Sequence, residues 1–150
     1  AAGAFTRFNL LPKLVVRLRT NSAITNTRIL VGLNESFAGV DTDTPSLTTQ
    51  RGIYVRYSTA AGDGGWVVQT VDGSGRTVSA TILAIAASTV YVITITTIST
   101  SSINVDINGT TVNVTANIIS GVNLGYEALV RDLAAATQSL ELESVYLSSL

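Results

Sequence analysis

The chain has 150 residues, of which 46% are hydrophobic and only 13% charged, and its formal net charge is −1. This length fits one domain with a substantial core, spanning 1–150, and is short for two ordinary domains. A near-neutral chain has no electrostatic attraction to nucleic acid or to an anionic membrane, so neither partner is expected. The absence of histidine and cysteine excludes Ser-His-Asp, Cys-His and His-based zinc chemistry.

Two further bulk features bear on the setting of the protein. The low charge leaves little to keep copies apart, so other subunits are expected to cover much of the surface. No basic start followed by an apolar core marks a signal peptide, and the most apolar stretch, 82–98, is too polar and slightly short for a membrane span. Because the first residue is not Met, we expect a processed chain or a piece cut from a longer protein.

The first half of the chain predicts short strands. Alternation places Leu14, Val16 and Leu18 on one face of the first strand and its arginines on the other. The segment 27–33 predicts a second strand, in which Gly32 indicates a bulge or a close backbone approach. Residues 34–50 form the longest loop, and a loop of this length within one domain is often functional.

The middle of the chain predicts paired strands. Segment 52–58 alternates cleanly, 66–71 returns after a Gly-rich turn, and 76–85 follows an Asp-Gly turn. Strands at 90–98, 103–107 and 112–114 come next. Asn108-Gly109 predicts a two-residue type I′ turn because both residues tolerate positive φ.

The last third is less uniform. Residues 125–138 hold good helix formers at nearly helical spacing and, on propensity alone, favour a short helix. Residues 140–147 predict a final strand, provided that one bulge near Ser144 corrects the phase of its apolar residues. Many short strands without alternating helices predict an all-β sandwich or barrel.

The order of several motifs adds a resemblance. GIYVRY, GGWV, YVITI, VDINGTTV, NIISGVNLGYEALV and SLELESVYL follow one another as in the concanavalin A-like jelly-roll domain of tail fibres, tail spikes and other virion surface proteins of bacterial and archaeal viruses. The resemblance covers about residues 8–147. It implies a two-sheet antiparallel jelly-roll sandwich of the lectin/glucanase type. It also implies a strand at 128–130 instead of a helix, while the family's first strands before Phe8 are short or absent here.

The function implied by the resemblance is host attachment or particle decoration. It implies a domain on the virion surface, outside the cell, that works as a homo-oligomer, with a trimer favoured, and contacts other virion proteins. A surface glycan is a possible ligand, and no cofactor or catalysis is expected. A purely structural oligomerising domain and a carbohydrate-binding module of a secreted hydrolase remain alternatives, because one fold hosts many functions.

Three aromatic or charged residues are candidate ligand contacts. Tyr54 and Arg56 point away from the apolar side of their strand, so they suit either a contact surface or an ordinary solvated face. Trp66 could stack on a sugar ring if exposed, but Val68 and Thr70 on its strand favour a core position.

The acidic residues are weaker candidates. A retaining glucanase needs Glu-x-Asp-x-x-Glu, and the nearest match, Glu141-Leu142-Glu143, lacks the third acid, so an exposed outer face is favoured. Asp41, Asp43 and Asp63 lie in loops, where they could ligate Ca²⁺, although turn formation is the commoner role and no metal site is expected.

Overall fold

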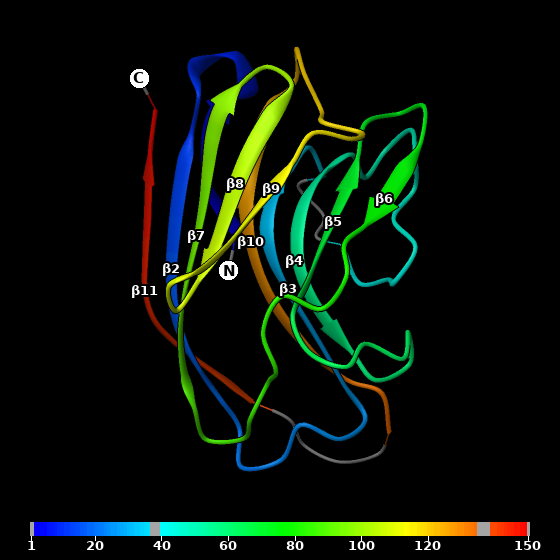
Figure 1. The fold of residues 1–150 in the computed structure, drawn as a ribbon, viewed down its shortest axis with the longest axis vertical. Helices are drawn as coiled ribbons and strands as arrows, with labels where there is room; N and C mark the ends of the chain where they lie inside the picture. The colour runs from blue at the N-terminus through cyan, green and yellow to red at the C-terminus, as the bar shows by residue number, and fades with distance from the viewer. Residues whose placement is uncertain (1, 37–39, 135–138, 150) are drawn as a thin grey trace.

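The computed structural model describes residues 2–36, 40–134 and 139–149, which form two β-sheets packed face to face (Figure 1). A single 3₁₀ turn, η1 (Phe8–Leu10), is the only helical element in these ranges. The described residues contain no helix long and apolar enough to cross a membrane. The strands are β1 (Ala2–Arg7), β2 (Lys13–Thr20), β3 (Thr27–Asn34), β4 (Gly52–Ser58), β5 (Val67–Val71), β6 (Arg76–Val78), β7 (Val90–Ser99), β8 (Ser102–Ile107), β9 (Thr110–Val114), β10 (Asn123–Asp132) and β11 (Leu140–Ser148).

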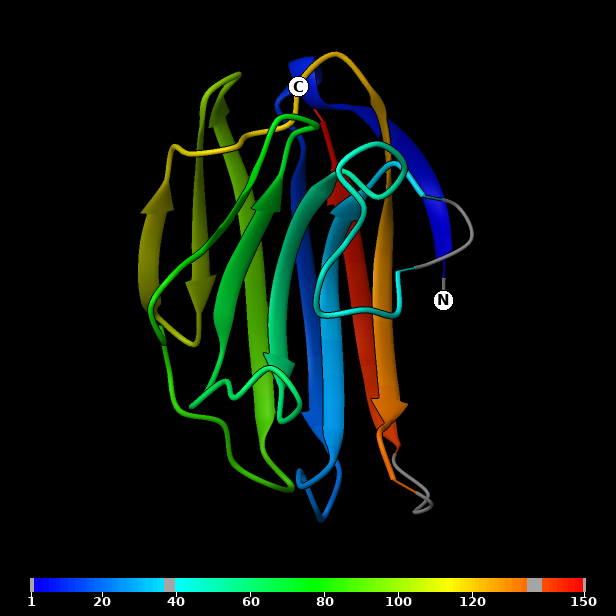
Figure 2. The same ribbon diagram turned by 90° about the vertical axis from the view of Figure 1, so that its right-hand side faces the viewer.

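The six-stranded first sheet has the order β1-β10-β3-β4-β5-β6, and the five-stranded second sheet has the order β11-β2-β7-β8-β9. Every neighbouring pair is antiparallel. Figure 2 looks onto the first sheet, in which strands distant in sequence, such as β3 and β10, lie side by side. The predicted two-sheet antiparallel jelly-roll sandwich is therefore confirmed.

The core lies between the sheets and follows the predicted alternation. Side chains at every second position of the central strands point inward and are almost completely shielded from solvent, because each strand turns successive side chains to opposite faces. These inward residues include Leu14, Val16, Leu18, Ile29, Val31, Leu33, Ile53, Val55, Tyr57, Ile93, Ile95, Ile103, Val105 and Ile107.

Of the two structures expected for residues 125–138, a helix or a strand, the structure shows a strand up to Asp132. β10 runs to Asp132 and pairs with β1 on one side and β3 on the other, so the helix is wrong over that range. Pairing with two neighbours overrides a local helix propensity that amounts to less than about 1 kcal/mol per residue. Residues 135–138 lie outside the described residues.

Two local predictions are confirmed. Asn108 and Gly109 both have positive φ, 50° and 87°, as a type I′ turn between β8 and β9 requires. The register of β11 against β2 shifts between Leu142 and Ser144, which is the predicted bulge.

One strand prediction needs correction, and one open alternative is decided. The strand expected at 76–85 ends at Val78, and beyond it only Leu83 pairs, in an isolated bridge with Trp66. The segment 79–85 reads SATILAI, and its Ile82, Leu83 and Ile85 pack against the core from a loop, so its apolar residues are covered without a continuous strand. Before Phe8, where the first strands were expected to be short or absent, the structure has one short strand, β1, of six residues, which pairs along the edge of β10.

Candidate functional site

The outward face of the first sheet is covered by the loop that joins β3 to β4. Figure 1 shows β3 and β4 bowed, with the loop lying on their hollow, outward side. Tyr54 and Arg56 point outward as predicted, yet they are only 0% and 5% exposed. The expectation that they form a solvent-exposed surface is therefore wrong, because the alternation of β4 reveals the direction of a side chain but not what folds over it.

Arg56 sits at the centre of a hydrogen-bonded network beneath the loop. Its guanidinium donates to both carboxylate oxygens of Asp63, at 2.9 and 2.8 Å, and to the backbone carbonyl of Asp43 at 2.8 Å. The Gln69 side chain accepts from the same guanidinium and donates to the same Asp43 carbonyl. With these partners, Arg56 anchors the loop to the sheet.

Arg28 and Arg131 hold the acidic end of the loop. Arg28 forms a two-pronged pair with the Asp43 carboxylate and also donates to Asp41, 2.8 Å away. Arg131 approaches the second oxygen of Asp41 at 2.9 Å. The hydrogen bonds from Arg28 lower the pKa of Asp43 below its ordinary range, although burial opposes the shift. Asp41, Asp43 and Asp63, considered above as calcium ligands, are thus acceptors for arginine.

A small apolar cluster and one buried carboxylate complete the covering. Val40 of the loop packs with Leu30, Tyr54 and Val71 of the sheet. Glu127 accepts from the Val40 backbone N–H at 2.7 Å and from the amide of Asn34 at 2.6 Å. Burial nevertheless raises the pKa of this carboxyl. The loop is therefore packed onto the sheet as a second, smaller layer of core.

Trp66 is a core residue. It is 0% exposed and lies between Tyr57 and Tyr91 in edge-to-face geometry, with ring centroids 6.4 and 5.3 Å away. The core position favoured from the sequence is confirmed. A ligand cannot stack on this ring without opening the sandwich.

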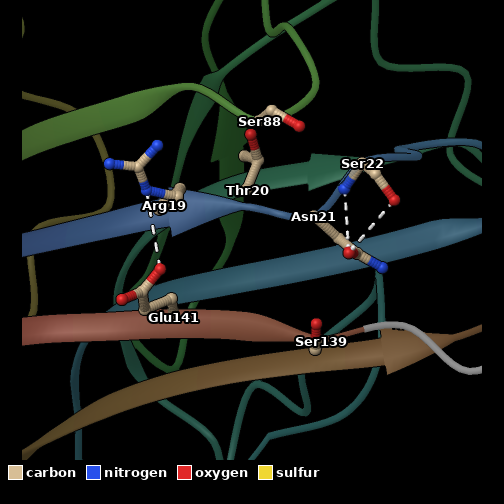
Figure 3. Close-up of a pocket in the computed structure, with 7 residues that line it drawn as sticks. All are labelled: Arg19, Thr20, Asn21, Ser22, Ser88, Ser139 and Glu141. Atoms are coloured by element: carbon tan, nitrogen blue, oxygen red, sulfur yellow. Dashed lines mark hydrogen bonds and ion pairs between the residues drawn. The ribbon is translucent and has the colours of Figure 1, made fainter.

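A polar pocket of about 270 Å³ lies at one end of the sandwich, where β2 ends and β11 begins (Figure 3). All of its lining side chains are polar or charged: Arg19, Thr20, Asn21, Ser22, Ser88, Ser139 and Glu141. This volume is just below the range of roughly 300–1,000 Å³ that is usual for small-molecule sites. The pocket therefore suits a small hydrophilic group.

The floor of the pocket is held by hydrogen bonds between two loops. The Thr20 hydroxyl donates to the Ala86 carbonyl at 2.7 Å and accepts from the Thr89 backbone N–H at 3.0 Å. The Ser88 N–H donates to the Asn21 carbonyl at 2.8 Å. These bonds tie the end of β2 to the loop before β7, so the lining is fixed before any ligand arrives.

One cation and one anion face each other at the rim. In Figure 3 Arg19 and Glu141 project from adjacent strands, and the Arg19 Nε atom lies 3.5 Å from a Glu141 oxygen. Their side chains are 47% and 67% exposed, so both groups remain accessible to a ligand. Hydroxyls, an amide, a guanidinium and a carboxylate together can donate to and accept from a polyhydroxylated molecule.

The predicted outer face of the last strand is confirmed. Glu141 and Glu143 pair with Arg19 and Arg17 on the outward side of the second sheet. No cluster of three or more potential metal-ligating side chains occurs in the described ranges.

The pocket was not predicted from the sequence. None of the predicted ligand contacts, Tyr54, Arg56 and Trp66, lines it. Its lining comes from three segments, near residues 20, 88 and 140, whose proximity depends on the pairing of β2 with β11 and β7. The polar turn at 21–26 was visible, but such turns are common in β proteins.

Comparisons with known proteins identify the fold. The structure resembles alginate lyase A1-II′ of polysaccharide lyase family 7, with a TM-score of 0.62 and 15% sequence identity over 97% of this chain and 65% of that one. It resembles ancestral congerin Con-anc, with a TM-score of 0.60 and 16% identity over 95% of both chains. It also resembles the carbohydrate binding module CBM66 from Bacillus subtilis, with a TM-score of 0.57 and 11% identity over 99% of this chain and 78% of that one.

These similarities establish a jelly-roll sandwich of the concanavalin A-like kind and no specific activity. This chain spans slightly less than two thirds of the length of the lyase. The similar structures include enzymes and a binding module, so the fold alone does not choose between catalysis and binding. No family model and no curated protein sequence matches the chain.

Proposed function

We propose that this chain is a non-catalytic carbohydrate-binding domain whose polar pocket takes part of a saccharide. The observation that carries the proposal is the pocket itself, whose lining is wholly polar and includes the accessible Arg19 and Glu141. The occurrence of a carbohydrate binding module and a polysaccharide lyase among similar structures supports the same ligand class. Binding without catalysis is supported by the two glutamates of β11, each of which pairs with arginine.

The biological setting we propose is the surface of a virion, outside the host cell. The order of sequence motifs from residue 52 to 147 supports this setting. Copies of the domain, together with other virion proteins, would display many weak sites. Such repetition can raise the overall avidity by about 10² to 10⁴ over a single site. Recognition of a host surface glycan is the role that fits this arrangement.

Saccharide binding is tested by a glycan array that includes alginate oligosaccharides, followed by titration calorimetry with the best ligand. Arg19→Gln and Glu141→Gln should each weaken binding about tenfold, as expected for loss of a charge-assisted hydrogen bond. Arg17→Gln is the matched control, because it removes the neighbouring ion pair with Glu143 on the same strands and Arg17 does not line the pocket.

Three results would contradict the proposal. No binding to any saccharide favours a purely structural domain. Equal binding by the pocket variants and their control moves the site elsewhere. Cleavage of alginate, detected as new unsaturated ends, makes the chain a lyase. A strictly monomeric protein that binds plant or microbial polysaccharides would instead favour a module of a secreted hydrolase.

A further inference from the structure

Strand β11 forms a long free edge of the second sheet. It pairs with β2 along one side, and no strand in the described part of the chain pairs with its other side. Its nine residues, LELESVYLS, contain no Pro, Lys or Arg. Proline, charged side chains and β-bulges are the usual devices that prevent a free edge from pairing. In β11 the two glutamates point outward and pair with arginines of β2, and the one bulge lies at the middle of the strand. The strand therefore retains the ability to hydrogen-bond to another strand.

The inward side chains next to this edge are incompletely covered. Leu140, Leu142, Val145 and Leu147 are only partly buried, whereas every inward aliphatic residue of the adjacent β2 is fully buried. The cause is the unequal size of the sheets. β11 lies across the sandwich from β10, and β1 extends the first sheet one strand further (Figure 2). A strand added beyond β11 would lie opposite β1.

The opposite edge of the second sheet, formed by β9, is shorter and more polar than β11. Strand β9 has only five residues, and its exposed positions are Thr110, Thr111 and Asn113. The segment after it turns back over the sandwich, where Ile119 is fully buried and the Ala116 carbonyl accepts from Thr70. Of the two edges, β11 therefore offers the longer and more apolar surface.

The bulge in β11 restricts how a second copy could pair with it. Inward residues have even numbers before the bulge, Leu140 and Leu142, and odd numbers after it, Val145 and Leu147. An antiparallel partner must place inward residues opposite inward residues, because a shift of one residue reverses every side chain. Over the whole strand, this condition places the first half of one copy against the second half of the other.

We infer that β11 pairs antiparallel with β11 of a second copy, forming a two-fold symmetric dimer with one sheet continuous across both subunits. Leu142 then faces Val145 of the partner subunit, and Leu140 faces Leu147 of the partner subunit. The two bulges oppose each other at the symmetry axis, so the pairing remains in phase on both sides. This contact is isologous, as in most homodimers.

The charges on the outward side are compatible with this register. Glu141 faces Tyr146 of the partner subunit, and Glu143 faces Ser144 of the partner subunit, so no two carboxylates lie directly opposite. Tyr146 is 61% exposed in the single chain and would gain cover. Arg17 and Arg19 of the same chain already pair with the two glutamates. A dimer, and not the trimer expected from the resemblance, follows from this geometry.

The first test places a charge at the axis. In the Ser144→Glu variant, the introduced carboxylate would face Glu143 of the partner subunit, and the contact occurs twice. Directly opposed like charges cost about 0.2–1 kcal/mol each, so dimerisation should weaken about two- to thirtyfold. Ser144→Lys is the matched control and should dimerise at least as strongly as the original chain. Sedimentation over a range of concentrations measures both, and high salt should reduce their difference.

The second test uses the absence of cysteine from the chain. The two copies of residue 144 would lie within disulfide distance across the axis, so Ser144→Cys should give a covalent dimer on mild oxidation. Asn113→Cys, on the opposite edge, should not. A monomer or a trimer of the original chain at all concentrations would overturn the inference, as would cross-linking through residue 113 instead. Saccharide binding is measured separately with Arg19→Gln, because Arg19 lines the pocket but lies on β2 and not on the paired edge.

Discussion

Arg28 and Asp43 form a two-pronged ion pair, with Nε donating to Oδ1 at 2.8 Å and Nη2 donating to Oδ2 at 2.7 Å. Both side chains are largely shielded, at 12% and 19% exposure, so solvent screens the pair less than it would a surface pair. The same residue, Asp43, accepts from Arg56 through its backbone carbonyl. One loop residue thus joins two arginines of the sheet.

Replacement of this carboxylate should loosen the loop. Asp43→Asn places an amide donor against the Arg28 guanidinium, and we expect a loss of about 2–3 kcal/mol in the free energy of unfolding at neutral pH. Chemical denaturation measures it. Glu143→Gln, which breaks an exposed pair, should cost less than about 1 kcal/mol. An equal loss of stability in the two variants would mean that the loop ion pair stabilises the fold no more than an exposed pair does.

The difference in stability between the original chain and Asp43→Asn should depend on pH. Because the pKa of Asp43 in the folded protein lies below its ordinary value of 3.8, the pair stabilises the fold above that value. This stabilisation disappears as the pH falls through the lowered pKa. The difference between the original chain and Asp43→Asn should therefore be largest at neutral pH and shrink in acid. A difference that stays constant with pH would contradict the role of the charge.

The contribution of Glu127 to stability should change with pH in the opposite direction to that of Asp43. Burial raises its pKa above the ordinary value of 4.5, although the Val40 N–H and the Asn34 amide oppose the shift. Its contribution is fully present below 4.5 and is lost as the pH rises through the raised pKa. Glu127→Gln should remove this loss, so the variant gains relative to the original chain as the pH rises. Parallel unfolding curves at pH values across this range provide the measurement.

The single tryptophan gives a spectroscopic test of where the ligand binds. Since Trp66 is buried between Tyr57 and Tyr91, saccharide binding at the pocket should leave its fluorescence unchanged. Unfolding should shift the emission strongly. Trp66→Ala should cost about 3–5 kcal/mol of stability. A saccharide-dependent shift of the emission in folded protein would show that the ligand reaches the core or changes its packing.

Gly32 is required by the close approach of β3 and β4. A Cβ atom at this position would meet the Ile53 carbonyl oxygen and the Tyr54 Cα atom, both of which belong to the backbone and cannot turn aside. Gly32→Ala should therefore destabilise the fold by at least about 2 kcal/mol. Gly64→Ala meets only a side-chain hydroxyl at ordinary contact distance and serves as the control. Thermal unfolding of the two variants gives the comparison.

The sequence predicted the fold better than the site, for a physical reason. Alternation in 52–58 correctly assigned Ile53, Val55 and Tyr57 to the core and pointed Tyr54 and Arg56 outward. It could not reveal the covering loop, because the ion pairs that fold it down join residues far apart in sequence. The pocket likewise depends on which strands become neighbours. Period-two patterns report the faces of a strand, whereas a site depends on the pairing of strands.

The strand order also constrains how the chain can fold. β1 pairs with β10, and Lys13 near the start of β2 lies opposite Ser148 near the end of β11. Each sheet therefore pairs a strand from residues 2–20 with a strand from residues 123–148, so neither sheet is complete until these later strands have left the ribosome. Contacts so distant along the chain slow folding, and truncation at either terminus would remove a partner from both layers.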